Sequence, residues 1–159
     1  MMRMLTTLVA VGLTLGLGGL FAAQRQAGDA EETYAEIENA LGQVPSFLRE
    51  YQKIGVSGAW EGMKGVALNP DTELSAKEKE LVALAVAASI PCEYCVYFHS
   101  AAAEASGASD QEMSEALAMA AAVRHWSTIL NGSDVDLDEF KRETDEIMEH
   151  LAEQHAGGE

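Results

Sequence analysis

The sequence predicts an all-α protein of about six or seven helices, and three observations lead to this class. No stretch alternates apolar and polar residues for long enough to suggest a sheet. Two S-x-x-E patterns, starting at Ser75 and Ser109, are capping boxes that mark the beginning of helices. Finally, the chain has 159 residues, of which 48% are apolar and 23% are charged, and this suits one folded core.

The N-terminal residues 1–30 are predicted to be an export signal. Arg3 precedes an uncharged run over residues 5–23, and a basic start before an apolar run is typical of such signals. The run is 19 residues long, close to the roughly 20 that span a bilayer, so an uncleaved membrane anchor is the alternative. A buried N-terminal helix is disfavoured because the glycines in the run weaken a soluble helix. We therefore expect an exported protein, either periplasmic or anchored facing outside the cytoplasm.

The predicted helical domain occupies residues 31–159, with a core over about residues 45–130. Three short helices come first, and Gly42 and the Asn69-Pro70 pair break the pattern between and after them. The expected ranges are about 30–41, 45 to 52 or 54, and 59–68.

The helix that begins at Ser75 is predicted to be the core helix. It carries no charge from Leu81 to Cys92, and a helix that is apolar all round is buried. Pro91 suits the first position of the next helix, which extends to about residue 106. The last two helices are expected over about 109–130, where Asn131-Gly132 ends an alanine-rich stretch, and over about 137–155.

The charge balance excludes several classes of partner. The chain has 10 Lys and Arg against 26 Asp and Glu, which gives a formal charge of −16. No basic cluster is present to neutralise phosphates, so no nucleic-acid partner is expected. The same acidity disfavours docking to an anionic membrane surface.

The residues Cys92, Cys95 and His99 form the pattern that carries chemistry. On a helix they are three and four positions apart, so all three side chains lie along one face. The two sulfurs can then form a disulfide, and the imidazole can lie beside the second sulfur. A helix N-terminus and a neighbouring His both lower the pKa of a thiol. The pattern therefore predicts a redox or nucleophilic site.

The cysteine pair has two other interpretations, a structural disulfide and part of a zinc site. An exported protein permits a structural disulfide, but a bridge that closes two intervening residues constrains the unfolded chain little. A zinc site would need further ligands, and no second CxxC or paired His follows, so no metal is predicted.

The stretch from Glu80 to His99, ELVALAVAASIPCEYCVYFH, resembles the core of the alkylhydroperoxidase AhpD, in the carboxymuconolactone decarboxylase superfamily. That family has a Glu twelve residues before the first Cys of a CxxC pair and a His four residues after the second. Glu80, Cys92, Cys95 and His99 match these positions. The resemblance covers roughly residues 45–130.

The resemblance implies a helical domain that assembles as trimers or hexamers and reduces hydroperoxides without a metal or organic cofactor. It implies that Cys95 attacks the peroxide and becomes a sulfenic acid, with which Cys92 condenses. His99, oriented by Glu80 or linked to it through water, would take the proton from Cys95. Helix-dipole reasoning alone favours Cys92 as the nucleophile, whereas the nearness of His99 favours Cys95.

The sequence departs from the family pattern in two ways. A His often lies between the two cysteines, where this chain has Glu93-Tyr94. The family's enzymes are cytosolic and are reduced again by a lipoylated partner, which an exported protein would not meet. In addition, the cluster Arg124-His125-Trp126 is expected to line the site, to form a subunit contact, or simply to cap and pack a helix.

The leading hypothesis is a thiol-dependent peroxidase that acts on a small hydroperoxide, with an unidentified dithiol or protein as reductant. One alternative is a non-catalytic exported helical oligomer whose disulfide locks a helical hairpin. The other is a cofactor-free decarboxylase of the same superfamily, an activity that does not require a CxxC pair.

Overall fold

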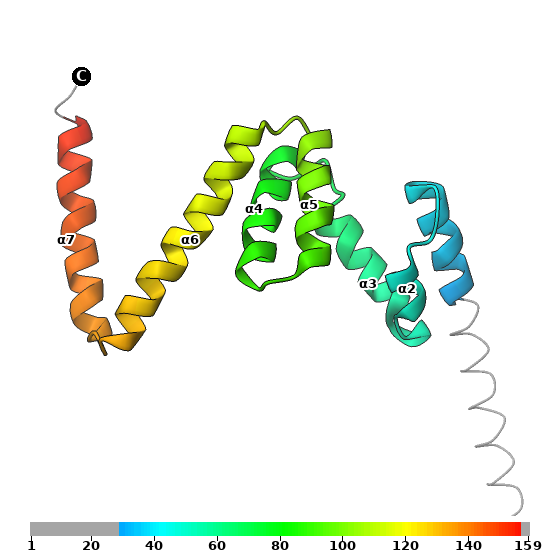
Figure 1. Ribbon diagram of the computed structural model, residues 1–159, viewed down its shortest axis with the longest axis horizontal. Helices are drawn as coiled ribbons and strands as arrows, with labels where there is room; N and C mark the ends of the chain where they lie inside the picture. The colour runs from blue at the N-terminus through cyan, green and yellow to red at the C-terminus, as the bar shows by residue number, and fades with distance from the viewer. Residues whose placement is uncertain (1–28, 157–159) are drawn as a thin grey trace, which may run out of the picture. The chain divides into compact units, whose positions relative to one another are not determined.

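The computed structural model describes residues 29–156, which are helical without a strand (Figure 1). The predicted all-α class is therefore confirmed. The predicted signal or anchor falls almost entirely outside the described residues. Over residues 29–156, no helix combines the length and the apolar character needed to cross a membrane. The chain divides into two compact units, Met1–Glu73 and Leu74–Glu159, each of which is described here by itself.

The first unit holds a helix over residues 29–41, then α2 (Ser46–Glu50) and α3 (Lys53–Val66). Gly42 ends the first helix as predicted, because its φ of 78° suits a residue without a Cβ. One apolar cluster forms the core of this unit, and partly buried Met63 packs against it. Its buried members are Ala30, Tyr34, Ile37, Val44, Leu48, Val56 and Trp60.

The helix α4 (Ala76–Ser89) begins the second unit where the capping box predicts it. Its buried residues Leu84 and Ala87 are 1% and 2% exposed, whereas Val82 and Val86 are 56% and 53% exposed. The expectation of a helix buried on all sides is therefore wrong. The sequence pattern predicts that an apolar face will be covered, but it does not distinguish cover by the same chain from cover by another chain.

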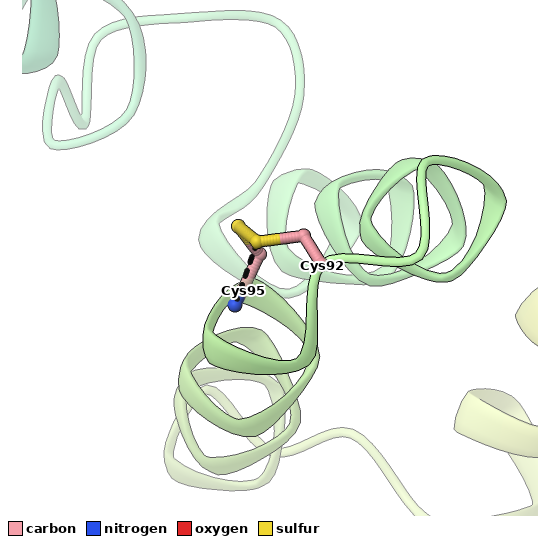
Figure 2. The surroundings of a disulfide bond; sticks show 2 residues. All are labelled: Cys92 and Cys95. Atoms are coloured by element: carbon pink, nitrogen blue, oxygen red, sulfur yellow. Dashed lines mark hydrogen bonds between the residues drawn. A yellow bond between two sulfur atoms is a disulfide. The ribbon is translucent and has the colours of Figure 1, made fainter.

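The helix α5 (Glu93–Ala105) follows α4 after a short connection, and the two helices pack against each other as a hairpin (Figure 1). It begins two residues later than the prediction from Pro91, because Cys92 takes the N-cap position. The Cys92 sulfur accepts a hydrogen bond from the Cys95 backbone N–H at 3.3 Å (Figure 2). The Cys92 sulfur thus caps the N-terminus of α5, as the side-chain oxygen of a Ser or Asp does at many helices.

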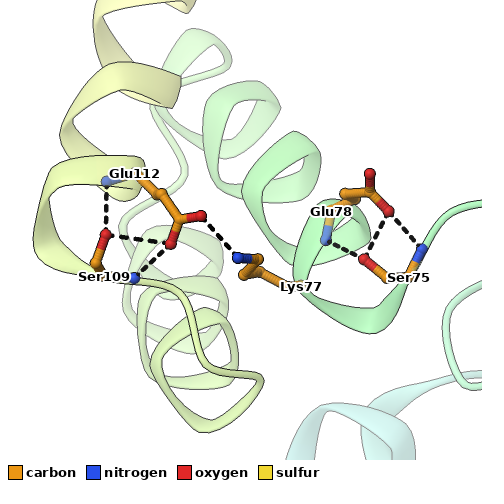
Figure 3. Close-up of polar contacts among 5 residues, drawn as sticks. All are labelled: Ser75, Lys77, Glu78, Ser109 and Glu112. Carbon is orange, nitrogen blue, oxygen red and sulfur yellow. Dashed lines mark hydrogen bonds and ion pairs between the residues drawn. The ribbon is translucent and has the colours of Figure 1, made fainter.

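The helix α6 (Asp110–Gly132) packs against α4 and begins at the predicted capping box. It continues through Asn131-Gly132, so the predicted stop at residue 130 is two residues too early. Lys77 near the start of α4 pairs with Glu112 of α6 at 2.7 Å, and Figure 3 shows this pair between the two capping boxes. The hydrogen bonds that Glu112 accepts from Lys77 and Ser109 lower its pKa from 4.5 to about 2.

The last helix, α7 (Leu137–Ala156), ends close to the predicted residue 155. Nearly all of its side chains are exposed, and α6 has no buried residue either. Apolar side chains on both helices are therefore open to solvent in the single chain. They include Met119, Val123 and Trp126 on α6 and Leu137, Ile147 and Met148 on α7.

Candidate active site

The two cysteines form a disulfide at the start of α5, with their Cα atoms 5.3 Å apart (Figure 2). Cys92 lies in the connection from α4 and Cys95 in the first turn of α5. Both are partly exposed, so small molecules in solution can reach the bond. The N–H donor at the Cys92 sulfur and the positive end of the α5 dipole both stabilise a negative charge on that atom once the disulfide opens.

Glu80 of α4 and His99 of α5 form a second pair in the same hairpin. The Glu80 Oε2 atom lies 2.7 Å from His99 Nδ1, and the side chains are 17% and 27% exposed respectively. Because an ionised carboxylate can only accept, Nδ1 carries the hydrogen, and the Nε2 of a neutral imidazole then carries the lone pair. Glu80 thereby selects the tautomer in which Nε2 can accept a proton.

All four residues singled out by the sequence thus belong to one helical hairpin. The structure joins them as two pairs, with a disulfide between the cysteines and a hydrogen bond between Glu80 and His99. On α5, His99 follows Cys95 by one helical turn, which places both side chains on one face. Such an arrangement can open and close a disulfide and move a proton. The individual roles of the four residues stay predictions.

A pocket of about 690 Å³ opens on the side of Cys92. The sequence analysis did not predict this pocket. The α5 residues that line it are three and four positions apart, which is the spacing of one helix face. Met113 of α6 completes it, and this contact between separate helices cannot be read from local spacing. The lining residues are Ala88, Pro91, Cys92, Glu93, Val96, Tyr97, Ser100, Ala101, Glu104 and Met113.

The Arg124-His125-Trp126 cluster lies on α6, and Arg124 reaches the end of α4. Arg124 Nη1 donates a hydrogen bond to the Ser89 carbonyl at 3.2 Å, so its guanidinium caps the last turn of α4. His125 and Trp126 pack edge to face with ring centroids 5.0 Å apart. The capping interpretation of Arg124 is therefore the one that the contact supports.

No three His, Cys, Asp or Glu side chains in residues 29–156 come together in a way that could hold a metal ion.

Comparison with known proteins agrees with this fold. The chain is similar to the crystal structure of the alkylhydroperoxidase AhpD core from Rhodospirillum rubrum, with a TM-score of 0.62 and 23% identity. The similarity covers 74% of this chain and 89% of that one, which shows that the two share a fold. A search of the curated proteins found no match.

The sequence pattern of the carboxymuconolactone decarboxylase family matches residues 55–135, just over half of the 159 residues. The matched stretch contains the whole α4–α5 hairpin, with the Cys92–Cys95 disulfide and the Glu80–His99 pair. The chain therefore belongs to the carboxymuconolactone decarboxylase family.

Proposed function

We propose that the protein is a thiol-dependent peroxidase that reduces small organic hydroperoxides with the Cys92–Cys95 pair. The observation that carries the proposal is that one hairpin holds both a partly exposed disulfide and a hydrogen bond between His99 and Glu80. The shared fold with a protein described as an alkylhydroperoxidase core supports the same reaction class. The substrate is then a hydroperoxide, and the electrons come from a dithiol or a thiol protein.

The proposed cycle begins with the reduced pair. The Cys95 thiolate attacks the terminal oxygen of the hydroperoxide, the O–O bond breaks, and the alcohol leaves after it takes up a proton. Cys95 is now a sulfenic acid. The Cys92 thiolate attacks its sulfur, the S–O bond breaks, and the disulfide forms as hydroxide leaves and takes up a proton to become water. The N–H donor at the Cys92 sulfur supports that second step, because it stabilises the attacking thiolate.

His99 would act as the proton acceptor for Cys95, with Glu80 as its positioning residue. The hydrogen bond from Nδ1 to Glu80 leaves Nε2 as the basic nitrogen, one helical turn from Cys95. The same bond stabilises the imidazolium that forms when His99 takes the thiol proton. A paired imidazole can then return this proton to the leaving alkoxide.

Steady-state turnover of cumene hydroperoxide with dithiothreitol as electron donor tests the proposal. We expect Cys95→Ser to abolish turnover, and Cys92→Ser to stop after a single oxidation of Cys95. Full turnover by Cys95→Ser would overturn the proposal. If the disulfide is structural instead, the wild-type protein shows no peroxidase activity. Cysteine substitution then lowers only the stability of the fold.

The proposal includes export and self-assembly. A homo-oligomer, trimeric or hexameric, would cover the apolar side chains that one chain leaves exposed on α4 and α6. Export rests on residues 1–30 of the sequence, and N-terminal mass analysis of protein purified from the native host distinguishes a cleaved signal from a retained anchor.

A further inference from the structure

Arg124 of α6 anchors the short connection in which Cys92 lies. Its Nη1 atom donates a hydrogen bond to the Ser89 carbonyl oxygen at 3.2 Å. Ser89 is the last residue of α4, and Cys92 follows it by three positions. Three residues span at most about 11 Å between Cα atoms, so this anchor lies close to Cys92. The guanidinium therefore ties the connection to a helix that carries none of the four residues of the redox site.

Other hydrogen bonds of the connection come from the hairpin itself. The Cys92 N–H donates to the Ala87 carbonyl at 3.1 Å, and the Cys92 sulfur accepts from the Cys95 N–H at 3.3 Å. These two bonds hold Cys92 between α4 and α5. The bond from Arg124 holds the same segment to α6, which packs against α4. The place of Cys92 thus depends on three helices.

Opening of the disulfide removes the covalent restraint on Cys92. Cys95 stays in the first turn of α5, whereas Cys92 precedes the helix as its N-cap residue. The position of the Cys92 thiol in the reduced protein then depends on the hydrogen bonds of the connection. A thiol that is already held beside its partner forms the bond at little cost in entropy, which raises the effective concentration of the pair.

We propose that Arg124 is a positioning residue for Cys92, whose bond to Ser89 keeps the reduced thiol in place for disulfide formation. The inference rests on the proposed redox function of the Cys92–Cys95 pair and deepens it. Its evidence is the contact that a third helix makes with the segment leading to Cys92. The contact matters most in the reduced protein, because in the oxidised protein the disulfide itself restrains the connection.

An effect of the Arg124 charge would have the opposite sign. Glu93 and Glu104 line the pocket beside Cys92, and a guanidinium near them offsets their repulsion of a thiolate there. Loss of the positive charge would destabilise the thiolate, which exists only in the reduced protein, and would therefore favour the disulfide. Loss of the positioning bond would favour the reduced form. The direction of the change separates the two effects.

Equilibration of the full chain with glutathione redox buffers tests the inference. Two glutathione thiols become one glutathione disulfide, and the two electrons and two protons that they lose convert the Cys92–Cys95 bond into two thiols. Alkylation followed by mass spectrometry gives the oxidised fraction. We expect Arg124→Met to lower the equilibrium constant for disulfide formation by about three- to tenfold, the size of one hydrogen bond. Arg124→Lys, whose ammonium can still donate to the Ser89 carbonyl, should recover part of this loss.

Arg142→Met is the matched control, because it removes a guanidinium that pairs with Glu146 on another helix, α7. It should leave the equilibrium constant unchanged. Arg124 is exposed, so we expect its variants to fold, and urea unfolding of the reduced proteins checks this. If Arg124→Met does not fold, Arg124→Lys carries the test and should show a smaller loss in the same direction. In the variant that carries the test, a constant equal to that of the wild type, or one that favours the disulfide, would overturn the inference.

Failure of the proposed peroxidase gives a different result. The glutathione equilibrium needs no hydroperoxide, and sulfenic acid on Cys95 is detected separately by mass in the Cys92→Ser variant. A lowered constant in Arg124→Met without any sulfenic acid would contradict the peroxidase and support the positioning role. Sulfenic acid on Cys95 together with an unchanged constant would support the peroxidase and contradict the positioning role.

Discussion

At the residue scale, the hydrogen bond from His99 to Glu80 decides which imidazole nitrogen can accept a proton. The carboxylate holds the hydrogen on Nδ1, so the lone pair lies on Nε2. The sequence predicted both residues from their offsets to the cysteines, and the structure joins them at 2.7 Å. It could not predict the pocket on the Cys92 side, because that pocket needs Met113 from a helix whose packing the local spacing does not reveal.

Substitution of this pair should separate proton transfer from packing. We expect His99→Asn to lower peroxidase kcat/KM by about 10²- to 10⁴-fold, because the base is lost. Glu80→Gln keeps the shape but no longer stabilises the imidazolium, so it should shift the pH profile of kcat/KM as well as lower it. Stopped-flow oxidation of the reduced protein across pH gives both quantities. His150→Asn, on exposed α7, is the control and should leave the profile unchanged.

An unshifted profile in Glu80→Gln, with only a lower stability, would assign Glu80 a structural role. A His99→Asn variant with wild-type kinetics would remove the imidazole from the proposed mechanism altogether.

At the scale of elements, the helix starts were more predictable than the helix ends and faces. The capping boxes fixed the beginnings of α4 and α6 because Ser and Glu side chains satisfy specific backbone N–H groups there. The end of α6 was missed because Asn131-Gly132 can be accommodated within a helix at modest cost. The prediction from Pro91 was two residues short of the start of α5, because Cys92 takes the N-cap position.

The pairing of Lys77 with Glu112, which links α4 to α6, should make stability depend on pH. The Glu112 pKa of about 2 lies below its ordinary value of 4.5, so the ionised carboxylate stabilises the folded state. This contribution is complete above pH 4.5 and is lost as the pH falls from 4.5 towards 2. We therefore expect the stability difference between wild type and Glu112→Gln to shrink over that window.

Urea unfolding followed by helical circular dichroism at several pH values measures this difference. Glu143→Gln, which removes a carboxylate from exposed α7, is the control and should show a smaller pH dependence. A Glu112→Gln difference that stays constant from neutral pH to pH 2 would contradict the assigned role of the Lys77–Glu112 pair.

At the scale of the whole molecule, the single chain leaves many large apolar side chains exposed to solvent. Val82 and Val86 leave one side of α4 open, and the α6 residues Met119, Val123 and Trp126 are each more than 60% exposed. Monomeric proteins rarely leave large apolar patches exposed, so these side chains are candidates for a subunit contact. The fold class followed from the sequence alone. The exposure of these faces in the single chain did not, because an apolar sequence pattern does not say what covers it.

Sedimentation velocity tests the proposed assembly. Wild type should sediment as a trimer or hexamer, and Val86→Glu should sediment as a smaller species, because the buried charge has no partner in the interface. Val66→Glu, at a 72% exposed valine of α3 in the first unit, is the matched control. Monomeric wild-type protein, or a Val86→Glu variant that keeps the wild-type mass, would contradict the proposed interface.

The most direct measurement is alkylation mass spectrometry of the reduced protein after one equivalent of an organic hydroperoxide. The chain has two cysteines, so every change in alkylation belongs to Cys92 or Cys95. We expect both alkylatable thiols to disappear together as the disulfide forms, and Cys92→Ser to stop at a sulfenic acid on Cys95. Thiols that stay alkylatable in the presence of hydroperoxide, or a disulfide that dithiothreitol does not open, would contradict it and leave the pair a structural role.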